Sequence, residues 1–291
     1  MRVTITFEHD CEDDGFEGST TLVRHEVDDL YALGKTFADA ARAGGFTYVE
    51  DVAFEKDDGQ MVFGDIIAYQ AAASKEKDLP LDAINKVDEL MEDVLENTCQ
   101  FPVSSSDYIV YLTGSSNFRY EIAKAAGYKA NRKDKPKPRY LGLTREYLVN
   151  NYEAITSEGE EADDLIGIAA TKFGPTTIVA SIDKDMLQLP CYHYNFTKGW
   201  SEVDEWSGTK FFYTQLLTGD VSDNIKGVPG IGPKKADKLL VECDTEQSLW
   251  DTCLEAYGGD LDLAIENARL LWLRREEGEM WEPPVSVDDT Q

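Results

Sequence analysis

Residues 161–185 read EADDLIGIAATKFGPTTIVASIDKD, and this stretch decides the fold. Its first half has an acidic start followed by helical periodicity, which predicts a helix over 161–173. Residues 176–181 are apolar and largely β-branched, which favours a buried strand. A helix that runs directly into a buried strand is typical of α/β folds with a mostly parallel sheet, where functional groups gather at the carboxyl ends of strands.

The residues on either side extend this α/β pattern. Apolar runs predict strands at 61–67 and 108–112, and the periodicity of 81–97 predicts a long helix. After about residue 211 the chain has short helical segments broken by Gly and Pro. We therefore expect an α/β domain over 61–210, with helices flanking the sheet, and a helical region over 211–291.

Residues 1–58 form a separate pattern. We predict a small α+β unit with strands at 3–7, 20–27 and 46–54, a helix at 28–43 and an acidic loop at 10–19. The unit carries 15 acidic and 5 basic residues. It contains no recognisable catalytic pattern, so its function is left open.

The chain as a whole is strongly acidic, with a formal charge of −28. This charge argues against nucleic acid as a partner, but residues 119–139 carry 8 basic and 2 acidic residues, which is the footprint of a local binding surface. No apolar run approaches a membrane span, and the N-terminus lacks the apolar core of a signal peptide. The cysteines form no CxxC pair, which suggests reduced thiols and a cytoplasmic protein.

Three clusters of carboxylates carry the strongest chemical signal. The first opens the helix at 161, where acids also suit the helix dipole, but the helix that follows is apolar and would bury them. The second follows the strand at 176–181, where residues two apart point to one side of an extended chain. The third has a spacing that suits one face of a helical turn. The clusters are Glu161, Asp163 and Asp164; Asp183 and Asp185; and Asp220 and Asp223.

Carboxylate oxygens are the ligands that Mg²⁺ and Mn²⁺ prefer, and two such ions about 4 Å apart can promote hydrolysis of a phosphodiester. One Asp-x-Asp alone is more often a solvated turn. Three clusters in this order favour a site for Mg²⁺ or Mn²⁺, with two ions expected.

Residues 227–236 read GVPGIGPKKA, a glycine hairpin that opens a helix with two lysines. Glycines let the backbone approach a phosphate, and the helix N-terminus directs N–H groups toward it. The pattern predicts a helix–hairpin–helix grip on the DNA backbone, independent of base sequence. Its expected contacts are Gly230, Gly232, Lys234 and Lys235.

Basic residues with aromatic neighbours between 117 and 139 form a second candidate DNA contact. This composition suits a phosphate backbone and an unstacked base, although a solvated basic loop is the alternative. The side chains expected to contact DNA are Arg119, Lys129, Arg132 and Lys133.

Taken together, these motifs resemble the flap endonuclease/5′→3′ exonuclease family, most closely its tailed-bacteriophage members, over about 61–281. The resemblance implies a PIN-like sheet, a basic arch or clamp at about 115–145, and a helix-three-turn-helix module in 211–291. It implies that the seven acids bind metal, that Lys129 and Arg132 steer the phosphate, and that these two act in catalysis with Asp183 and Asp185. It also implies a K⁺ held by backbone carbonyls near Val228 and Ile231.

Two positions depart from the family pattern. The metal-binding Asp at the end of the first strand is replaced by Phe63, and an Asp often found after the second strand is replaced at Gly114. Asp65 lies two residues beyond Phe63 and is expected to substitute as a ligand, because alternate residues of a strand share a side.

The resulting hypothesis is a monomeric nuclease that hydrolyses DNA at or near 5′ ends, flaps or junctions, in phage DNA replication within the host cytoplasm. Exonuclease and flap-endonuclease action remain equally open. One alternative is a catalytically degenerate DNA-binding protein, because Phe63 and Gly114 supply no ligand; another is an RNase H-like nuclease on RNA–DNA hybrids. The unit at 1–58 would dock a replication protein or act as an acidic mask that competes with DNA.

Overall fold

The computed structural model describes residues 3–11, 16–24, 36, 39–40, 61–98, 108–132 and 136–284. The chain divides into two compact units, Met1–Asp57 and Asp58–Gln291. This division lies next to the predicted end of the N-terminal unit at 58.

The described part of the first unit is an antiparallel hairpin of β1 (Val3–Cys11) and β2 (Phe16–Arg24), in which Val3 pairs with Arg24. Both strands extend into the acidic stretch at 10–19, so the loop predicted there is wrong at both ends. Backbone pairing continues through polar residues because the hydrogen bonds of the ladder use main-chain groups alone. Of the predicted helix at 28–43, only residues 36, 39 and 40 are described, and they are helical. The predicted strand at 46–54 lies outside the described residues.

The second unit is built on a six-stranded sheet with the order β5-β4-β3-β6-β7-β8. All neighbouring pairs are parallel except β7 and β8, which confirms the expected mostly parallel sheet. The strands are β3 (Met61–Phe63), β4 (Tyr108–Leu112), β5 (Ile155–Thr156), β6 (Ile178–Ala180), β7 (Tyr192–Asn195) and β8 (Gly199–Glu202).

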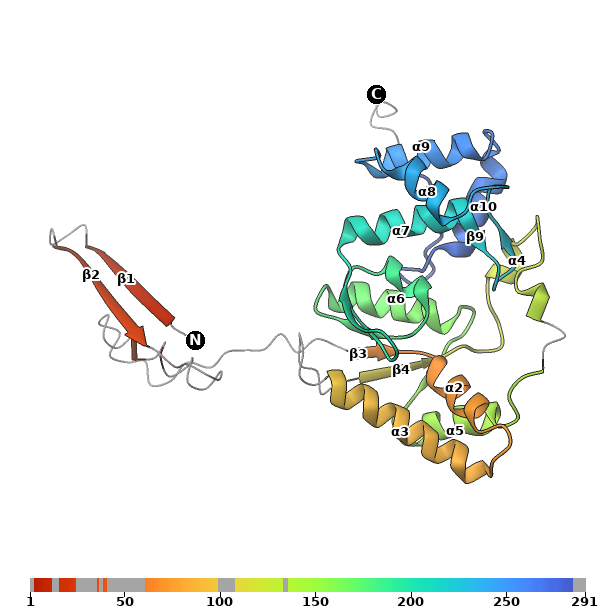
Figure 1. Ribbon diagram of the computed structural model, residues 1–291, viewed down its shortest axis with the longest axis horizontal. Coiled ribbons are helices and arrows are strands. Elements are labelled where there is room, and N and C mark those ends of the chain that lie inside the picture. Colours follow the sequence, from red (N-terminus) through yellow and green to blue (C-terminus); the bar gives the residue numbers. More distant parts are fainter. Residues whose placement is uncertain are drawn as a thin grey trace. The chain divides into compact units, whose positions relative to one another are not determined.

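Helices cover both faces of this sheet (Figure 1). On one face lie α2 (Ile66–Ser74), α3 (Pro80–Thr98) and α5 (Leu141–Tyr152), packed on a core that includes Met61 and Phe63. On the other lies α6 (Ala162–Phe173), which packs on Val62 and Val179. Alternate residues of β3 therefore serve opposite cores, as the two-residue period of a strand requires.

The first predicted strand is too long. The observed strand β3 ends at Phe63, and the apolar residues from Ile66 onward form α2 instead. A short apolar run fits a buried strand and a buried helix equally well, and periodicity alone does not separate them. The helix after residue 80 and the strand at 108–112 agree with prediction.

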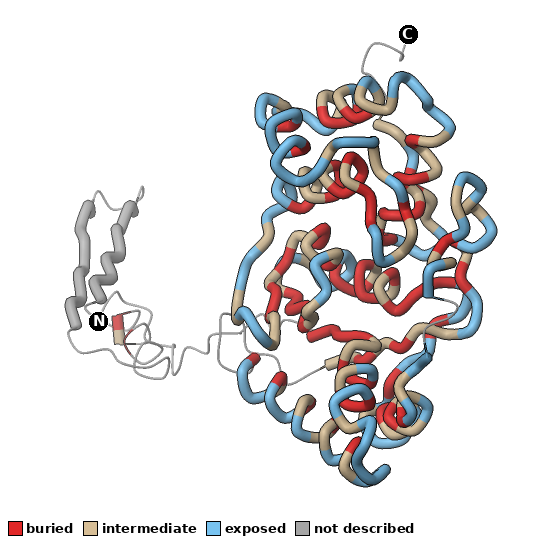
Figure 2. The backbone as a smooth tube through the Cα atoms, turned by 45° about the vertical axis from the view of Figure 1, so that its right-hand side comes forward, coloured by how far each residue is buried: buried red, intermediate tan, exposed pale blue. Residues whose placement is uncertain are grey.

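The C-terminal part of the second unit is mainly helical and has its own buried core, which includes Phe212, Tyr213 and Trp250 (Figure 2). Its first helix, α7 (Glu205–Thr218), crosses the boundary predicted at 210–211. The later elements are the β9 (Gly219–Asp220) and β10 (Ile225–Lys226) pair, α8 (Pro233–Leu240), α9 (Glu246–Ala256) and α10 (Leu261–Leu271).

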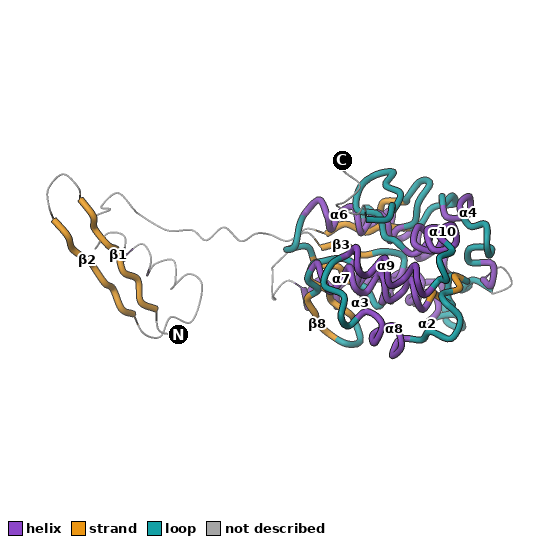
Figure 3. The backbone as a smooth tube through the Cα atoms, turned by 90° about the horizontal axis from the view of Figure 1, so that it is seen from above, coloured by secondary structure: helices purple, strands orange, loops and turns teal. Residues whose placement is uncertain are grey.

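Short helical turns in the segments that follow β4 and β6 contact this C-terminal region, and Figure 3 shows the molecule from above. They are α4 (Arg119–Ile122), η1 (Ala130–Arg132) and η2 (Lys184–Gln188). None of the helices within the described ranges combines the length and apolar character needed to cross a membrane.

Candidate active site

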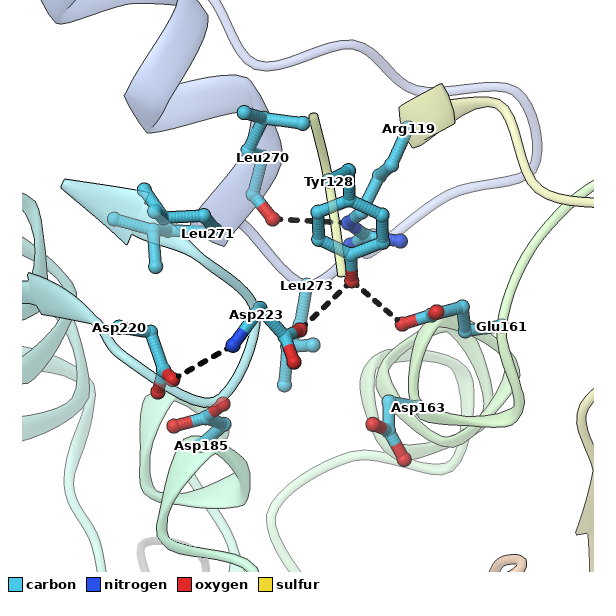
Figure 4. Close-up of a pocket in the computed structure, with 11 residues that line it drawn as sticks. Arg119, Tyr128, Glu161, Asp163, Asp185, Asp220, Asp223, Leu270, Leu271 and Leu273 are labelled. Carbon is cyan, nitrogen blue, oxygen red and sulfur yellow. Dashed lines mark hydrogen bonds between the residues drawn. The ribbon is translucent and has the colours of Figure 1, made fainter. Parts of the chain in front are cut away.

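The three predicted acidic clusters converge on one pocket of the second unit (Figure 4). Glu161 and Asp163 face it from α6, Asp185 from η2, and Asp220 and Asp223 from the β9–β10 hairpin. The remaining lining residues are Arg119, Tyr128, Ile225, Leu270, Leu271 and Leu273. Residues that are far apart in sequence are thus brought beside the N-terminus of α6.

Asp164 is bound inside the protein. It is 0% exposed, and its two oxygens accept hydrogen bonds of 2.5 and 2.8 Å from the guanidinium of Arg119. It also closes a capping box at the start of α6 with Glu161. Burial alone would raise the pKa of Asp164, but the hydrogen bonds and charge of Arg119 outweigh it, and the pKa is lowered. Asp164 therefore holds α6 in place rather than offering oxygens to the pocket.

Arg119 was predicted to contact DNA, and the structure does not place it where it could. The side chain is 2% exposed, and besides Asp164 it donates to the backbone carbonyls of Leu270 (2.9 Å) and Trp272 (2.7 Å). It joins α6 to the end of α10. A second arginine, Arg274, pairs with Glu160 at 3.1 Å and reinforces this junction.

Tyr128 bridges the two sides of the pocket. Its hydroxyl lies 3.0 Å from Glu161 Oε2 and 2.8 Å from Asp223 Oδ2. A phenol has one proton to donate, so it satisfies only one of these carboxylates. The ammonium of Lys129 compensates, because it lies 2.5 Å from Glu161 and 3.5 Å from Asp223. Burial and the neighbouring Glu161 charge raise the pKa of Tyr128, which stays protonated.

The segment 127–132 is docked on the turn between β9 and β10. Lys129 N donates to Asp223 O (2.9 Å), Asn131 Nδ2 to Val221 O (2.7 Å), and Arg132 Nε to Ser222 O (3.0 Å). Arg132 also forms an ion pair with Asp223. The two predicted phosphate-steering side chains thus lie at the pocket, paired with its acids, while the predicted Lys133 lies outside the described residues.

Asp185 lines the pocket and Asp183 lies beside it without lining it, in a different geometry from the one predicted. Asp183 caps η2, and its side chain accepts the backbone N–H of Asp185 at 3.0 Å. The chain is therefore turned rather than extended, because an Asp after a strand readily caps a helical turn. Burial, followed by the charges of Asp183 and Asp220, raises the pKa of Asp185 to about 7.

Asp220 and Asp223 belong to a β hairpin and not to the predicted helical turn. Asp220 Oδ1 accepts the N–H groups of Ser222 (2.6 Å) and Asp223 (3.2 Å), which closes the turn. Asp220 Oδ2 lies 3.1 Å from Lys184 Nζ. Burial opposes ionisation of Asp220, but its hydrogen bond to Lys184 prevails and lowers its pKa.

Asp163 faces the pocket without such compensation. Burial raises its pKa well above the usual range, and the charges of Glu161 and Asp183 raise it further. Together with Asp185, it shows that the pocket holds more negative charge than its lysines and arginines offset.

A divalent cation fits this donor set in charge and chemistry, because hard oxygen ligands with excess negative charge are what Mg²⁺ and Mn²⁺ bind. Within the described ranges, however, no three Asp, Glu, His or Cys side chains lie close enough to hold an ion as they stand. The reason is visible in the contacts above: Lys129 and Lys184 already occupy the carboxylates. An ion would have to replace these ammonium groups.

The residues near the ends of β3 and β4 that were compared with family metal ligands lie outside the lining of the pocket. Asp65, the predicted substitute ligand, does not line the pocket; it pairs with Arg145 and accepts the N–H of Thr113 at 2.7 Å. Phe63 is fully buried. A side chain at Gly114 would collide with the Ser157 carbonyl.

The predicted glycine hairpin joins the β9–β10 hairpin to α8. Gly230 has φ 77°, which only glycine adopts easily, and Gly232 caps α8. Lys234 and Lys235 are exposed in the first turn of α8, as a grip on a phosphate backbone requires. The K⁺ expected near Val228 and Ile231 stays a prediction.

Sequence reasoning missed four residues that shape the site: Tyr128 as a bridge, Lys184, Arg145 and Arg274. Tyr128 lies within the basic segment at 117–139, and Lys184 lies between two predicted ligands. Clustered acids need hydrogen-bond donors and cations beside them, and this requirement could have identified both residues. Arg145 and Arg274 carry no local signal, because their partners are distant in sequence.

The sequence of this chain is similar to that of known proteins. The family model of the 5′-3′ exonuclease N-terminal resolvase-like domain matches residues 57–213. Flap endonuclease Xni of Vibrio parahaemolyticus is 34% identical over 163 residues, covering 49% of this chain and 62% of the relative. DNA polymerase I of Rhizobium leguminosarum is 32% identical over 239 residues, covering 75% of this chain and 22% of the relative. The chain thus spans less than two thirds of these relatives.

Solved structures support the fold. A structure of T5 5′-exonuclease with divalent zinc ions has a TM-score of 0.55 and 19% identity, covering 73% of this chain and 88% of that one. At this identity the likeness shows the fold alone, a PIN-like sheet between helices. Because the family model covers more than half of the sequence, this chain belongs to the family of the 5′-3′ exonuclease N-terminal resolvase-like domain.

Proposed function

We propose that this chain is a divalent-metal-dependent 5′-nuclease that hydrolyses DNA phosphodiesters at or near 5′ ends. The observation that carries the proposal is the convergence of Glu161, Asp163, Asp185, Asp220 and Asp223 in one pocket with excess negative charge. Buried carboxylates that repel one another are costly, and a structure retains them where a cation or a reaction needs them.

The acids facing the pocket, with Asp183 beside them, would hold Mg²⁺ or Mn²⁺. A bound ion would supply an activated water and positive charge for the leaving oxygen of a phosphodiester. Asp164 would act indirectly, by fixing the N-terminus of α6 through Arg119.

Lys129 and Arg132 would attract the phosphate backbone. Both now neutralise Glu161 and Asp223, so an incoming ion frees their charges for the phosphate beside the pocket. The exposed lysines of α8 would hold the duplex through its backbone. These groups recognise phosphate and not base edges, so specificity would come from the shape of ends, flaps and junctions.

DNA is the proposed substrate because of these backbone-directed groups and because of the relatives. A T5 D15 flap endonuclease structure, with 19% identity and a TM-score of 0.52, is described as a complex with DNA and metal ions. A role in phage DNA replication, action in the host cytoplasm, a monomeric state, a bound K⁺ and a replication partner for residues 1–58 remain part of the proposal, supported by the resemblance alone.

The experiment follows both ends of the substrate. A 5′ flap and a blunt duplex, labelled separately at the 5′ and 3′ ends, are incubated with the protein in Mg²⁺, and products are sized. The proposal expects cleavage that starts at or near the 5′ end and stops in EDTA. Exclusive cleavage of an RNA–DNA hybrid, or attack from the 3′ end, would contradict it.

A second candidate function is structure-specific DNA binding without hydrolysis. The observation that favours it is the loss of carboxylates at Phe63 and Gly114. Phe63 is fully buried and stacked on Tyr108, with ring centroids 5.8 Å apart. Flap binding in Ca²⁺ with no cleavage in Mg²⁺ or Mn²⁺ would support this candidate over the first.

A further inference from the structure

The carboxylates of the site differ in whether an arginine of the chain already neutralises them. Near the ends of β3 and β4, Asp65 has both oxygens engaged. One pairs with Arg145, and the other accepts the backbone N–H of Thr113 at 2.7 Å. Arg145 also donates to the Thr113 carbonyl at 2.6 Å, so one guanidinium joins the ends of both strands. A fixed cation of the protein therefore occupies this position.

The two strand-end positions that could add ligands are closed by packing. The Phe63 side chain is 0% exposed, in the core shared with α2, α3 and α5. The backbone at Gly114 lies against Ser157, whose hydroxyl accepts the Gly114 N–H at 2.9 Å. A Cβ at Gly114 would overlap the Ser157 carbonyl. Gly114 therefore has no room for a side chain, and a carboxylate at position 63 would lie in an apolar core rather than in the pocket.

Asp164 is also unavailable as a metal ligand, because Arg119 binds both of its oxygens within the core. Arginine stays protonated at any working pH, and a buried bidentate pair is costly to separate. Asp164 is therefore not released for an ion.

On the opposite side of the pocket, the cations that pair with the acids are more exposed to solvent than Arg119 and Arg145. Asp220 is paired with Lys184, whose side chain is 60% exposed. Asp223 is paired with Arg132, whose side chain is 49% exposed. The two acids are 4% and 17% exposed while both cations extend into solvent, so Lys184 and Arg132 can move into water when an ion takes the carboxylates. Asp185 lines the same pocket as Asp220 and Asp223, and its carboxylate lies 3.9 Å from the Lys184 ammonium.

We infer that this chain binds one divalent cation, held by the acids that face the pocket, and that the Arg145–Asp65 pair takes the place of a second ion beside β3 and β4. The inference rests on the proposed function, which assigns the acidic pocket to divalent ions, and limits that assignment to a single ion. Phosphate charge on this side of the pocket would then be met by Lys129 instead of metal.

The test counts ions directly. Full-length protein is freed of metal with EDTA and titrated with Mn²⁺ at about 0.15 M KCl, and free Mn²⁺ is measured by electron paramagnetic resonance. The expected result is one tight ion per chain. Asp220→Asn is expected to weaken its binding at least about tenfold. Asp65→Asn is expected to leave both the number and the affinity unchanged within about twofold.

Glu92→Gln, which removes an exposed carboxylate on α3, measures the nonspecific contribution of a very acidic chain. Two tight ions in the wild type would overturn the inference while leaving the proposed function intact. Loss of Mn²⁺ in Asp65→Asn, with circular dichroism unchanged, would overturn it as well. No tight ion at all would contradict the proposed function itself, and the wild-type count decides even if a variant fails to fold.

Discussion

Individual acids of this protein have different tasks that their sequence positions do not reveal. Asp163 and Asp164 are neighbours, yet the first faces the pocket and the second is bound by Arg119 in the core. The sequence identified both as acids at a helix start, because local spacing is enough for that. It could not separate their roles, because Arg119 lies 45 residues away.

Replacing Arg119 tests its structural role. We predict that Arg119→Met lowers the free energy of unfolding by roughly 3–5 kcal/mol, since it leaves Asp164 buried without its partner. Urea unfolding followed by circular dichroism measures the change. The exposed Arg139 offers a matched control, and Arg139→Met is expected to change stability by less than about 0.5 kcal/mol. Equal stability of Arg119→Met and wild type, with DNA binding lost, would restore Arg119 as a DNA contact.

Asp185 provides a pH-dependent prediction. Its pKa is about 7 in the folded chain and near 3.8 in the unfolded chain. The folded state therefore binds the proton more tightly, and protonation at low pH stabilises the fold. The unfolded chain releases this proton near pH 4, so the contribution falls as pH rises from about 4 to about 7. In EDTA, Asp185→Asn should therefore raise the Tm by roughly 5 °C at pH 8, as about 2 kcal/mol would, with less than half of that effect at pH 5.

Differential scanning fluorimetry at both pH values measures this change. Mg²⁺ should raise the Tm of the wild type more than that of Asp185→Asn, because only the wild type gains the full ligand set. A lower Tm for Asp185→Asn at pH 8 in EDTA would show that the ionised carboxylate stabilises the fold, contrary to this account.

At the scale of elements, the site depends on contacts between segments that sequence patterns treat separately. The strand β6 and helix α6 follow from periodicity, and their acids were expected at strand ends and helix starts. The docking of residues 127–132 on the β9–β10 turn was not foreseen, because it consists of single backbone and side-chain bonds with no repeating pattern. The predicted geometries of Asp183 and Asp220 failed for a similar reason: local capping replaced regular structure.

Lys129 links that docked segment to the acids. We predict that Lys129→Met binds Mn²⁺ roughly tenfold more tightly than wild type, because no ammonium competes for Glu161. The same variant should cleave DNA at least about 100-fold more slowly, because a phosphate-neutralising charge is lost. Mn²⁺ titration and single-turnover cleavage measure the two effects. Lys124→Met, at an exposed lysine, serves as the control; weaker Mn²⁺ binding by Lys129→Met would contradict competition.

The first turn of α8 is expected to bind the DNA backbone independently of the acidic pocket. Lys234→Ala combined with Lys235→Ala should weaken duplex binding regardless of sequence and reduce the salt dependence by about two phosphate contacts. Fluorescence anisotropy over a range of KCl concentrations, in Ca²⁺, measures both. Lys238→Ala, in the last turn of the same helix, should have a smaller effect. An unchanged salt slope in the double variant would place the DNA elsewhere.

For the whole molecule, the sequence was sufficient for the fold class and for the family. Both follow from local motifs: strand–helix alternation, three acidic clusters and a glycine hairpin. The sequence was insufficient for charge balance, because pairing acids with arginines requires the tertiary structure. The net charge of −28 illustrates this limit. It does not reveal which acids are paired with arginines in the core, or which acids in the pocket lack enough neighbouring positive charge.

The central claim is that the acids of Figure 4, with Asp183 beside them, form one hydrolytic site. The most direct test is the single-turnover rate of 5′-flap cleavage in Mg²⁺ by wild type and Asp183→Asn, a change that keeps a side chain able to cap η2. We expect cleavage by the wild type and a loss of at least about 100-fold in the variant. Equal rates for the two proteins would contradict it, because the acidic pocket would then have no part in the chemistry.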